Sequence, residues 1–114
     1  MAGDSADHAA SIREFKAAVN MTPAALEQWL ATDESRAVGI VHGQGTESVG
    51  HRSGRRIVEL LRKPASELSD GDIAHMRKVV GYVHRHLAQR PAGDVRDTPW
   101  RHSLMNWGHD PLKA

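Results

Sequence analysis

Apolar side chains recur at helical spacing, three and four positions apart, in five segments of the chain. Capping residues or prolines mark most of the boundaries between these segments. The predicted helices cover about residues 10–20, 23–30, 53–63, 70–89 and 99–107. No segment has the sustained alternation that is typical of a strand. We therefore predict an all-α fold, a compact single domain of about five helices over residues 10–114, behind a flexible N-terminus of residues 1–9.

Two of the helix starts consist of a threonine followed directly by a proline. Thr22 and Thr98 are the predicted N-caps, and a proline fits the first helical position because its missing N–H costs no hydrogen bond there. Ser69, with Asp72 three residues later, resembles a capping box at the start of the longest helix. Gly108 is the predicted stop of the last helix.

Four glycines interrupt the stretch RAVGIVHGQGTESVG, residues 36–50, and no helical period crosses it. We predict a glycine-rich loop here. Val38, Ile40 and Val41 leave a short extended piece open as the alternative.

The chain has 114 residues and no cysteine. This length suits one domain with a modest core, and the lack of cysteine excludes disulfides and cysteine-bound zinc. No apolar run approaches the roughly 20 residues that span a bilayer. The first residues also lack the basic and then apolar order of a secretory signal. We expect a cytoplasmic protein without a membrane partner.

The net charge of +1 conceals an uneven distribution along the chain. Residues 1–50 contain three basic and seven acidic side chains, a net charge of −4. Residues 51–114 contain twelve basic and seven acidic side chains, a net charge of +5. A basic half of this kind favours a polyanionic partner.

The basic residues of the second half gather on two predicted helices. On a helical wheel of the longest one, the core stripe consists of Ile73, Met76, Val79, Val80, Val83 and Leu87. The opposite face carries Lys78, Tyr82, Arg85, His86 and Gln89. The preceding helix adds Arg52, Arg55, Arg56, Arg62 and Lys63 against a single acid, Glu59.

These faces predict a small nucleic-acid-binding protein, with DNA as the expected partner, that contacts mainly the phosphate backbone. The predicted nucleic-acid-binding residues are Arg52, Arg55, Arg56, Lys78, Arg85, His86 and Gln89. Free N–H groups at the helix start near His51 would add an anion site. Tyr82 is placed for base stacking, whereas the three tryptophans lie on apolar faces and are predicted core residues.

Two other interpretations stay open at this point. Charged helix faces are often merely solvated. Alternatively, the acidic half of one copy could dock on the basic half of another, which would make the chain a protein-interaction or homo-oligomerising helical module without nucleic-acid affinity.

The eight histidines do not form a metal-binding pattern. His84 and His86 are two positions apart and so point to different sides of a helix, and His75 lies about 16 Å from His86 along the axis. His84, at the margin of the core stripe, is predicted to be half-buried. We predict no metal and no other cofactor. No catalytic or phosphate-loop motif is present, and we predict that the protein is not an enzyme.

Three stretches, ESVGHRSGRRIVELLRK, HMRKVVGYVHRHLAQRP and WRHSLMNWGHDP, resemble the family called domain of unknown function 3140. This family consists of small bacterial proteins of about this length, and the resemblance extends from Phe15 to Lys113. Some members carry a DNA-binding label, so the resemblance favours the DNA-binding interpretation by association. The family has no established mechanism from which site residues could be carried over.

Overall fold

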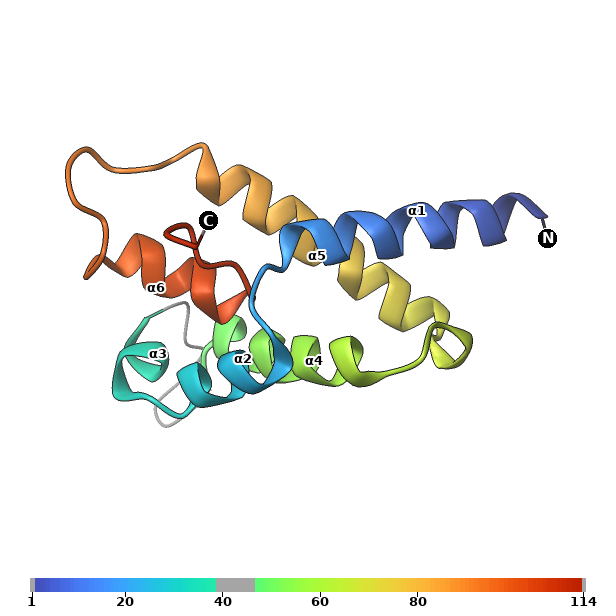
Figure 1. Cartoon of the computed structure of the whole chain (residues 1–114), viewed down its shortest axis with the longest axis horizontal. Coiled ribbons are helices and arrows are strands. Elements are labelled where there is room, and N and C mark those ends of the chain that lie inside the picture. The colour runs from blue at the N-terminus through green and yellow to red at the C-terminus, as the bar shows by residue number, and fades with distance from the viewer. Residues whose placement is uncertain (1, 39–46, 114) are drawn as a thin grey trace.

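The computed structural model describes residues 2–38 and 47–113, and within these ranges the chain forms six α-helices, one short 3-10 helix and no strand (Figure 1). The helices are α1 (Ala2–Ala18), α2 (Pro23–Leu30), α3 (Asp33–Ala37), α4 (Val49–Arg62), η1 (Ala65–Glu67), α5 (Asp70–Leu87) and α6 (Pro99–Asn106). The predicted all-α class is therefore confirmed, and all five predicted helices are present.

Two helix starts and one additional helix differ from the sequence-based prediction. Helix α1 begins at Ala2, eight residues before its predicted start, and α4 begins at Val49 with Ser48 as its N-cap. Helix α3 is additional: Thr32 caps it by accepting a hydrogen bond from the backbone of Ser35. It is too short to carry a helical period, so only this cap could have predicted it. The predicted glycine-rich loop falls mostly on residues 39–46, which lie outside the described residues.

The predicted caps of the other helices are confirmed. The side chains of Thr22 and Thr98 each accept a hydrogen bond from the backbone three residues later, with a proline in the first turn. Ser69 and Asp72 form both halves of a capping box, each side chain 3.1 Å from the other's backbone nitrogen. Gly108 directly follows Trp107, the C-cap residue of α6, and has φ = +83°, a conformation that favours glycine.

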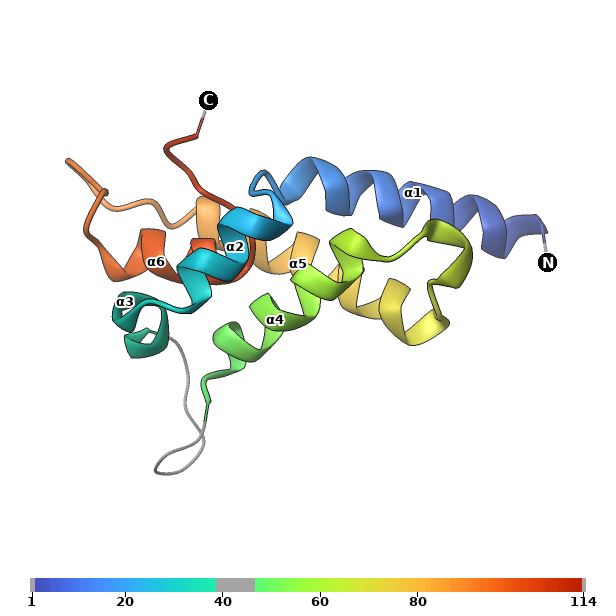
Figure 2. The ribbon, with the colours of Figure 1, turned by 60° about the horizontal axis from the view of Figure 1, so that its bottom comes forward.

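The helices pack as two pairs that α6 connects. Helix α1 packs across α5, α2 packs against α4, and α6 contacts both pairs as well as α3 (Figures 1 and 2). The largest fully buried apolar residues of the helices come from both pairs and from α6: Phe15, Leu26, Ile57, Ile73, Met76, Val79, Val83 and Leu104. The predicted stripe of α5 thus forms the centre of the core, with Val80 and Leu87 partly buried at its margin. Val95, in the segment between α5 and α6, is also buried.

Helices α4 and α5 form a wedge rather than a tightly packed pair. They are joined by the turn that contains η1, and their other ends lie apart on the side of α6 (Figure 1). Trp107, the C-cap of α6, reaches the space between them and is 4% exposed. The wedge therefore brings side chains from three helices to one place.

Helix α4 approaches α2 and α6 most closely at Gly54. A Cβ atom at this position would lie 2.6 Å from the carbonyl oxygen of Asn106 and 2.6 Å from a methyl group of Leu30. Any larger residue would have to displace the α6 backbone, because a carbonyl oxygen cannot rotate away as a side chain does. The absence of a side chain at Gly54 sets the distance between these helices.

Asn106 is the polar centre of the fold and is 1% exposed. Its side-chain oxygen accepts hydrogen bonds from Trp29 Nε1 at 2.7 Å and from Ser35 Oγ at 2.5 Å. Its amide nitrogen donates to the Ser35 carbonyl at 3.0 Å. One buried amide thus connects α2, α3 and α6, and every buried side-chain polar atom of the described residues has a partner.

The segment that follows α6 returns to the linker between α1 and α2. Asn20 donates to the Asp110 carbonyl at 2.9 Å and accepts from the Asp110 backbone at 2.7 Å. Met21 donates from its backbone to the Gly108 carbonyl at 3.2 Å, and His109 Nδ1 lies 2.7 Å from the Ala18 carbonyl. These contacts join positions about ninety residues apart in the chain.

Candidate functional site

A pocket of about 360 Å³ lies in the wedge between α4 and α5, and we call it the wedge pocket. Its walls are formed by Val49, Arg52, Ser53, Arg56, His75, Lys78 and Trp107. Three of the seven predicted nucleic-acid-binding residues, Arg52, Arg56 and Lys78, therefore converge on one place. Arg52 and Arg56 are one helical turn apart on α4, and Lys78 faces them from α5.

Cations exceed carboxylates around the wedge pocket. Arg56 Nη2 lies 3.3 Å from Asp72 Oδ1, and Lys63 Nζ lies 2.8 Å from Asp72 Oδ2. The hydrogen bond from Lys63, together with that from the Ser69 backbone, lowers the pKa of Asp72 far below its usual range. Arg52 and Lys78 form no ion pair with any described residue. Three cations thus line the pocket, and Asp72 pairs with only one of them, Arg56, which leaves the two positive charges of Arg52 and Lys78 unpaired among the described residues.

His75 supplies a neutral polar group to the wall of this pocket. Its Nε2 atom lies 2.9 Å from Ser53 Oγ, and the ring is partly buried. Burial, and then the positive charges of Arg56 and Lys78, lower the pKa of His75 to about 4. The ring is therefore uncharged at neutral pH, and it experiences the positive potential of the pocket.

The lowered pKa of His75 predicts acid sensitivity of the fold. Between pH 6.5 and 4 the unfolded chain binds a proton at this position that the folded chain does not, so stability falls as the pH falls through this window. The urea midpoint should decrease from pH 7 to pH 4.5. A His75→Gln variant should lose part of this slope, even if its stability at neutral pH is lower. If the urea midpoint of the variant depended on pH as steeply as that of the wild type, the lowered pKa of His75 would not be the cause of the acid sensitivity.

Five aromatic rings form a continuous stack along α5. His75 and Tyr82 are seven residues apart, about 10.5 Å along a helix axis. The Trp107 ring lies 6.3 Å from His75 and 4.2 Å from Tyr82, with interplanar angles of 15°, so it lies between them. His86 stacks on Tyr82 at 5.1 Å, and Trp100 stacks on His86 at 6.1 Å. The stack fixes α6 against α5.

The stack changes the roles predicted for Tyr82 and His86. Tyr82 has Trp107 on one face and His86 on the other, so neither face is open for a base. His86 Nε2 lies 3.2 Å from the Trp100 carbonyl, to which it donates. Burial lowers the pKa of His86, which makes its ring neutral at pH 7. The structure thus places His86 in the α5–α6 contact rather than on an open basic surface.

Arg85 and Gln89 lie outside the wedge pocket but on the same side of the molecule as Lys78. Both are exposed, two and three turns beyond Lys78, with Gln89 just after the end of α5. The guanidinium of Arg85 lies over Gly81, where a Cβ atom would be only 2.9 Å from Nη1. Arg90, which was not predicted, lies 5.4 Å from the ring centre of Trp100, in cation–π geometry. The basic surface of α5 therefore continues beyond the pocket.

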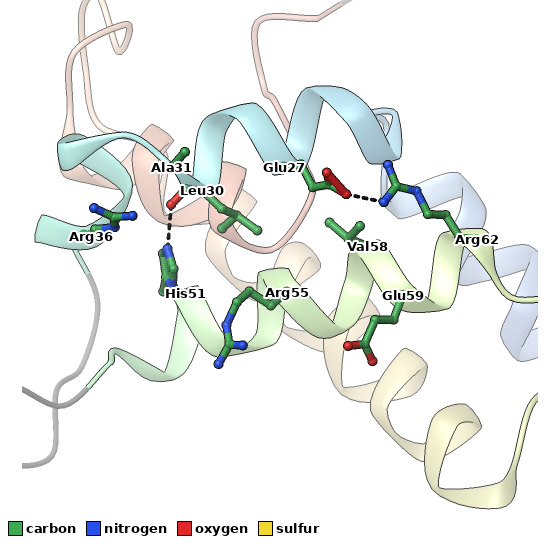
Figure 3. Close-up of a pocket in the computed structure, with 9 residues that line it drawn as sticks. All are labelled: Glu27, Leu30, Ala31, Arg36, His51, Arg55, Val58, Glu59 and Arg62. Carbon is green, nitrogen blue, oxygen red and sulfur yellow. Dashed lines mark hydrogen bonds and ion pairs between the residues drawn. The ribbon is translucent and has the colours of Figure 1, made fainter.

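Arg55 points away from the wedge pocket, into a second pocket of about 420 Å³ between α2 and α4 (Figure 3). It donates to Glu47 from Nε at 2.8 Å. Its hydrogen bond, together with that of His51, lowers the pKa of Glu47 to about 2. Across the same pocket Arg62 pairs with Glu27 (Figure 3). Arg55 and Arg62 are thus occupied in ion pairs, and Arg55 is not part of the convergent cluster.

His51 is buried and does not present an anion site at a helix start. The Ser48 hydroxyl accepts a hydrogen bond from the backbone N–H of His51. The Nε2 atom of His51 donates to the Leu30 carbonyl at 2.7 Å (Figure 3). His84, predicted to be half-buried, is instead exposed. Over residues 2–38 and 47–113, no group of three histidine, aspartate or glutamate side chains is arranged to hold a metal ion.

The sequence indicated the cations of the wedge pocket, and a helical wheel places His75 on the same face, but it did not indicate Ser53 or Trp107. His75 lies one turn before Lys78, so the helical wheel contained a signal for it. Trp107 carried no such signal, because its apolar spacing on α6 gives no information about which helix it contacts.

In the described part of the chain, none of the helices combines the length and the apolarity needed to span a bilayer.

Comparison with known proteins identifies a family and no further relative. The family model described as Protein of unknown function (DUF3140) matches residues 14–105, which include all of α2 to α5 and most of α6. Neither a curated protein nor a solved structure matches the chain. The match covers the whole wedge pocket except Trp107. The chain therefore belongs to the family described as Protein of unknown function (DUF3140).

Proposed function

We propose that this protein binds nucleic acid, with DNA as the expected form, mainly through the phosphate backbone. The observation that supports this proposal is the convergence of Arg52, Arg56 and Lys78 on the wedge pocket with an excess of positive charge. Arg85 and Gln89 extend the contact surface along α5. Arginine and lysine side chains are the principal donors to backbone phosphates.

The comparison of the two pockets supports this assignment of the surface. In the pocket between α2 and α4, Arg55 and Arg62 pair with Glu47 and Glu27, so little charge is left for a ligand. Three cations and no carboxylate line the wedge pocket, and only Arg56 of the three has an ion-pair partner, Asp72. A polyanion gains free energy only where cations are not already neutralised. We therefore place the nucleic acid on the wedge side of α4.

Base-specific readout is not part of the proposal. The rings along α5 are stacked on one another, and Tyr82 is covered on both faces. Contacts to phosphate fix the position of a protein on its partner without reading the sequence. We expect affinities that differ little between oligonucleotides of different sequence.

Fluorescence anisotropy with duplex and single-stranded oligonucleotides at two salt concentrations tests the proposal. We expect binding at about 50 mM salt that weakens steeply at higher salt, because phosphate contacts release counterions. The double variant Arg52→Gln/Lys78→Gln should bind about tenfold more weakly and lower the salt slope by about two. The control Arg55→Gln/Arg62→Gln removes the same charge from the other side of α4 and should retain most of the affinity.

Three results would contradict the proposal: no binding at low salt, binding without a salt slope, or equal losses in the two double variants. Light scattering on the same samples adds a positive alternative. A salt-sensitive dimer that binds no oligonucleotide would favour the interpretation of the chain as a homo-oligomerising module.

A further inference from the structure

We infer that the wedge pocket takes a terminal phosphate group, the phosphomonoester at the end of a nucleic-acid strand, in preference to an internal phosphodiester. This inference rests on the proposed nucleic-acid binding and specifies the group that enters the pocket. It concerns the place where Arg52, Arg56 and Lys78 meet, rather than the exposed basic surface farther along α5.

The size of the pocket favours an end group. Its volume of about 360 Å³ is at the lower limit of small-molecule sites. A phosphate with its sugar is small enough for such a space, whereas several consecutive nucleotides are too large for it. The diverging α4 and α5 form the two basic walls, and Val49 and Trp107 provide the apolar part of the lining.

The charge of the pocket favours a dianion. Three cations line it, and two of them, Arg52 and Lys78, form no ion pair with a described residue, whereas Arg56 pairs with Asp72. An internal phosphodiester carries one negative charge, whereas a phosphomonoester carries about 1.5 to 2 at neutral pH. The terminal group also has three oxygens that accept hydrogen bonds from arginine and lysine. Both properties increase the interaction of the pocket with a strand end.

The aromatic residue of the pocket does not provide a competing site for a base. Trp107 is 4% exposed and lies between the rings of His75 and Tyr82, so both of its faces are covered. The Ser53 hydroxyl is engaged with His75 Nε2. Without an open ring face, the pocket offers mainly charged donors, which select phosphate rather than base identity.

Competition experiments with matched oligonucleotides test the inference. The probe is an internally labelled oligothymidine of about ten nucleotides, long enough to occupy one single-strand site. The competitors are the same strand with a 5′-phosphate, with a 3′-phosphate, or with no terminal phosphate. An unphosphorylated strand that is two nucleotides longer controls for total charge, because its two additional phosphodiesters carry about the charge of one terminal phosphate. Thymidine monophosphate tests whether the nucleotide alone is sufficient.

We expect at least one terminally phosphorylated strand to compete about tenfold better than the longer unphosphorylated strand, a difference of about 1.4 kcal/mol. The comparison of the 5′-phosphorylated with the 3′-phosphorylated strand identifies which end of the strand enters the wedge pocket. In the Lys78→Gln variant this preference should disappear, whereas Arg55→Gln should retain it. The imidazole NMR signals of His75 should shift with the phosphorylated strand and shift much less with the unphosphorylated one.

The outcomes separate this inference from the proposed function. Salt-dependent binding with equal competition by all strands would overturn the inference and leave the proposed function intact. No salt-dependent binding of any strand would overturn both. Competition by thymidine monophosphate at the same concentration as the phosphorylated strand would also overturn the strand-end assignment, because the nucleotide alone would then account for it. A preference that survives Lys78→Gln would place the phosphate outside the wedge pocket.

Discussion

Replacing Gly54 with alanine is expected to lower the free energy of unfolding by about 3 kcal/mol, at the upper end of overpacking effects. The added Cβ would lie 2.6 Å from the Asn106 carbonyl oxygen and equally close to a methyl group of Leu30. The leucine can change its rotamer, but the carbonyl belongs to the α6 backbone and can move only with that helix. Urea unfolding followed by circular dichroism measures the change.

Gly71→Ala is the matched control for this variant. Gly71 is an exposed glycine in the first turn of α5, and a Cβ atom there would lie 3.7 Å from its nearest neighbour, the Ser69 hydroxyl. The same substitution should therefore be neutral or stabilise the protein by up to about 1 kcal/mol through helix propensity. If both variants were equally stable, the close approach at Gly54 would not limit the packing of α4.

Asn106→Ala is expected to lower the free energy of unfolding by about 3 to 5 kcal/mol. The substitution would leave the Trp29 N–H, the Ser35 hydroxyl and the Ser35 carbonyl without their partner. All three groups surround a side chain that is 1% exposed, so water cannot replace the lost bonds without opening the core. Thermal and urea unfolding of the full chain measure the loss.

A double-mutant cycle separates these hydrogen bonds from general damage to the core. Trp29→Phe removes the indole donor and retains an aromatic ring. If the hydrogen bond matters, Asn106→Ala should cost less in the Trp29→Phe background than in the wild type, by about 1 kcal/mol. Additive effects would show that the indole contributes only by packing. As a control, the substitution Gln89→Ala at an exposed position should change the free energy of unfolding by less than about 0.5 kcal/mol.

The sequence carried most of the information about the helices. The stripe from Ile73 to Val83 predicted the buried face of α5, and Thr22, Ser69 and Thr98 predicted three helix starts. These features depend on residues close together in the chain, which is why their spacing is informative. Helix α3 was missed because five residues are too few for a period, although Thr32 was visible as a cap.

The candidate site was predictable only in part. Helical spacing brings Arg52, Arg55 and Arg56 near enough to share a surface. The charge pattern alone does not say that Arg55 pairs with Glu47 and lines a different pocket. The position of Lys78 opposite Arg52 depends on the divergence of α4 and α5, which no local pattern encodes. Likewise His86 and Tyr82 looked available on a wheel, and the tryptophans that cover them come from α6 and its cap.

The return of the segment after α6 to the linker after α1 has a consequence for synthesis of the chain on the ribosome. Asn20 cannot meet Asp110, nor Ala18 meet His109, until about ninety further residues have been translated. Asn106 likewise reaches Ser35 and Trp29 only after α6 has left the exit tunnel. During translation α1 and α2 therefore lack these hydrogen-bond partners. Closure of the native core is a late event that depends on α6.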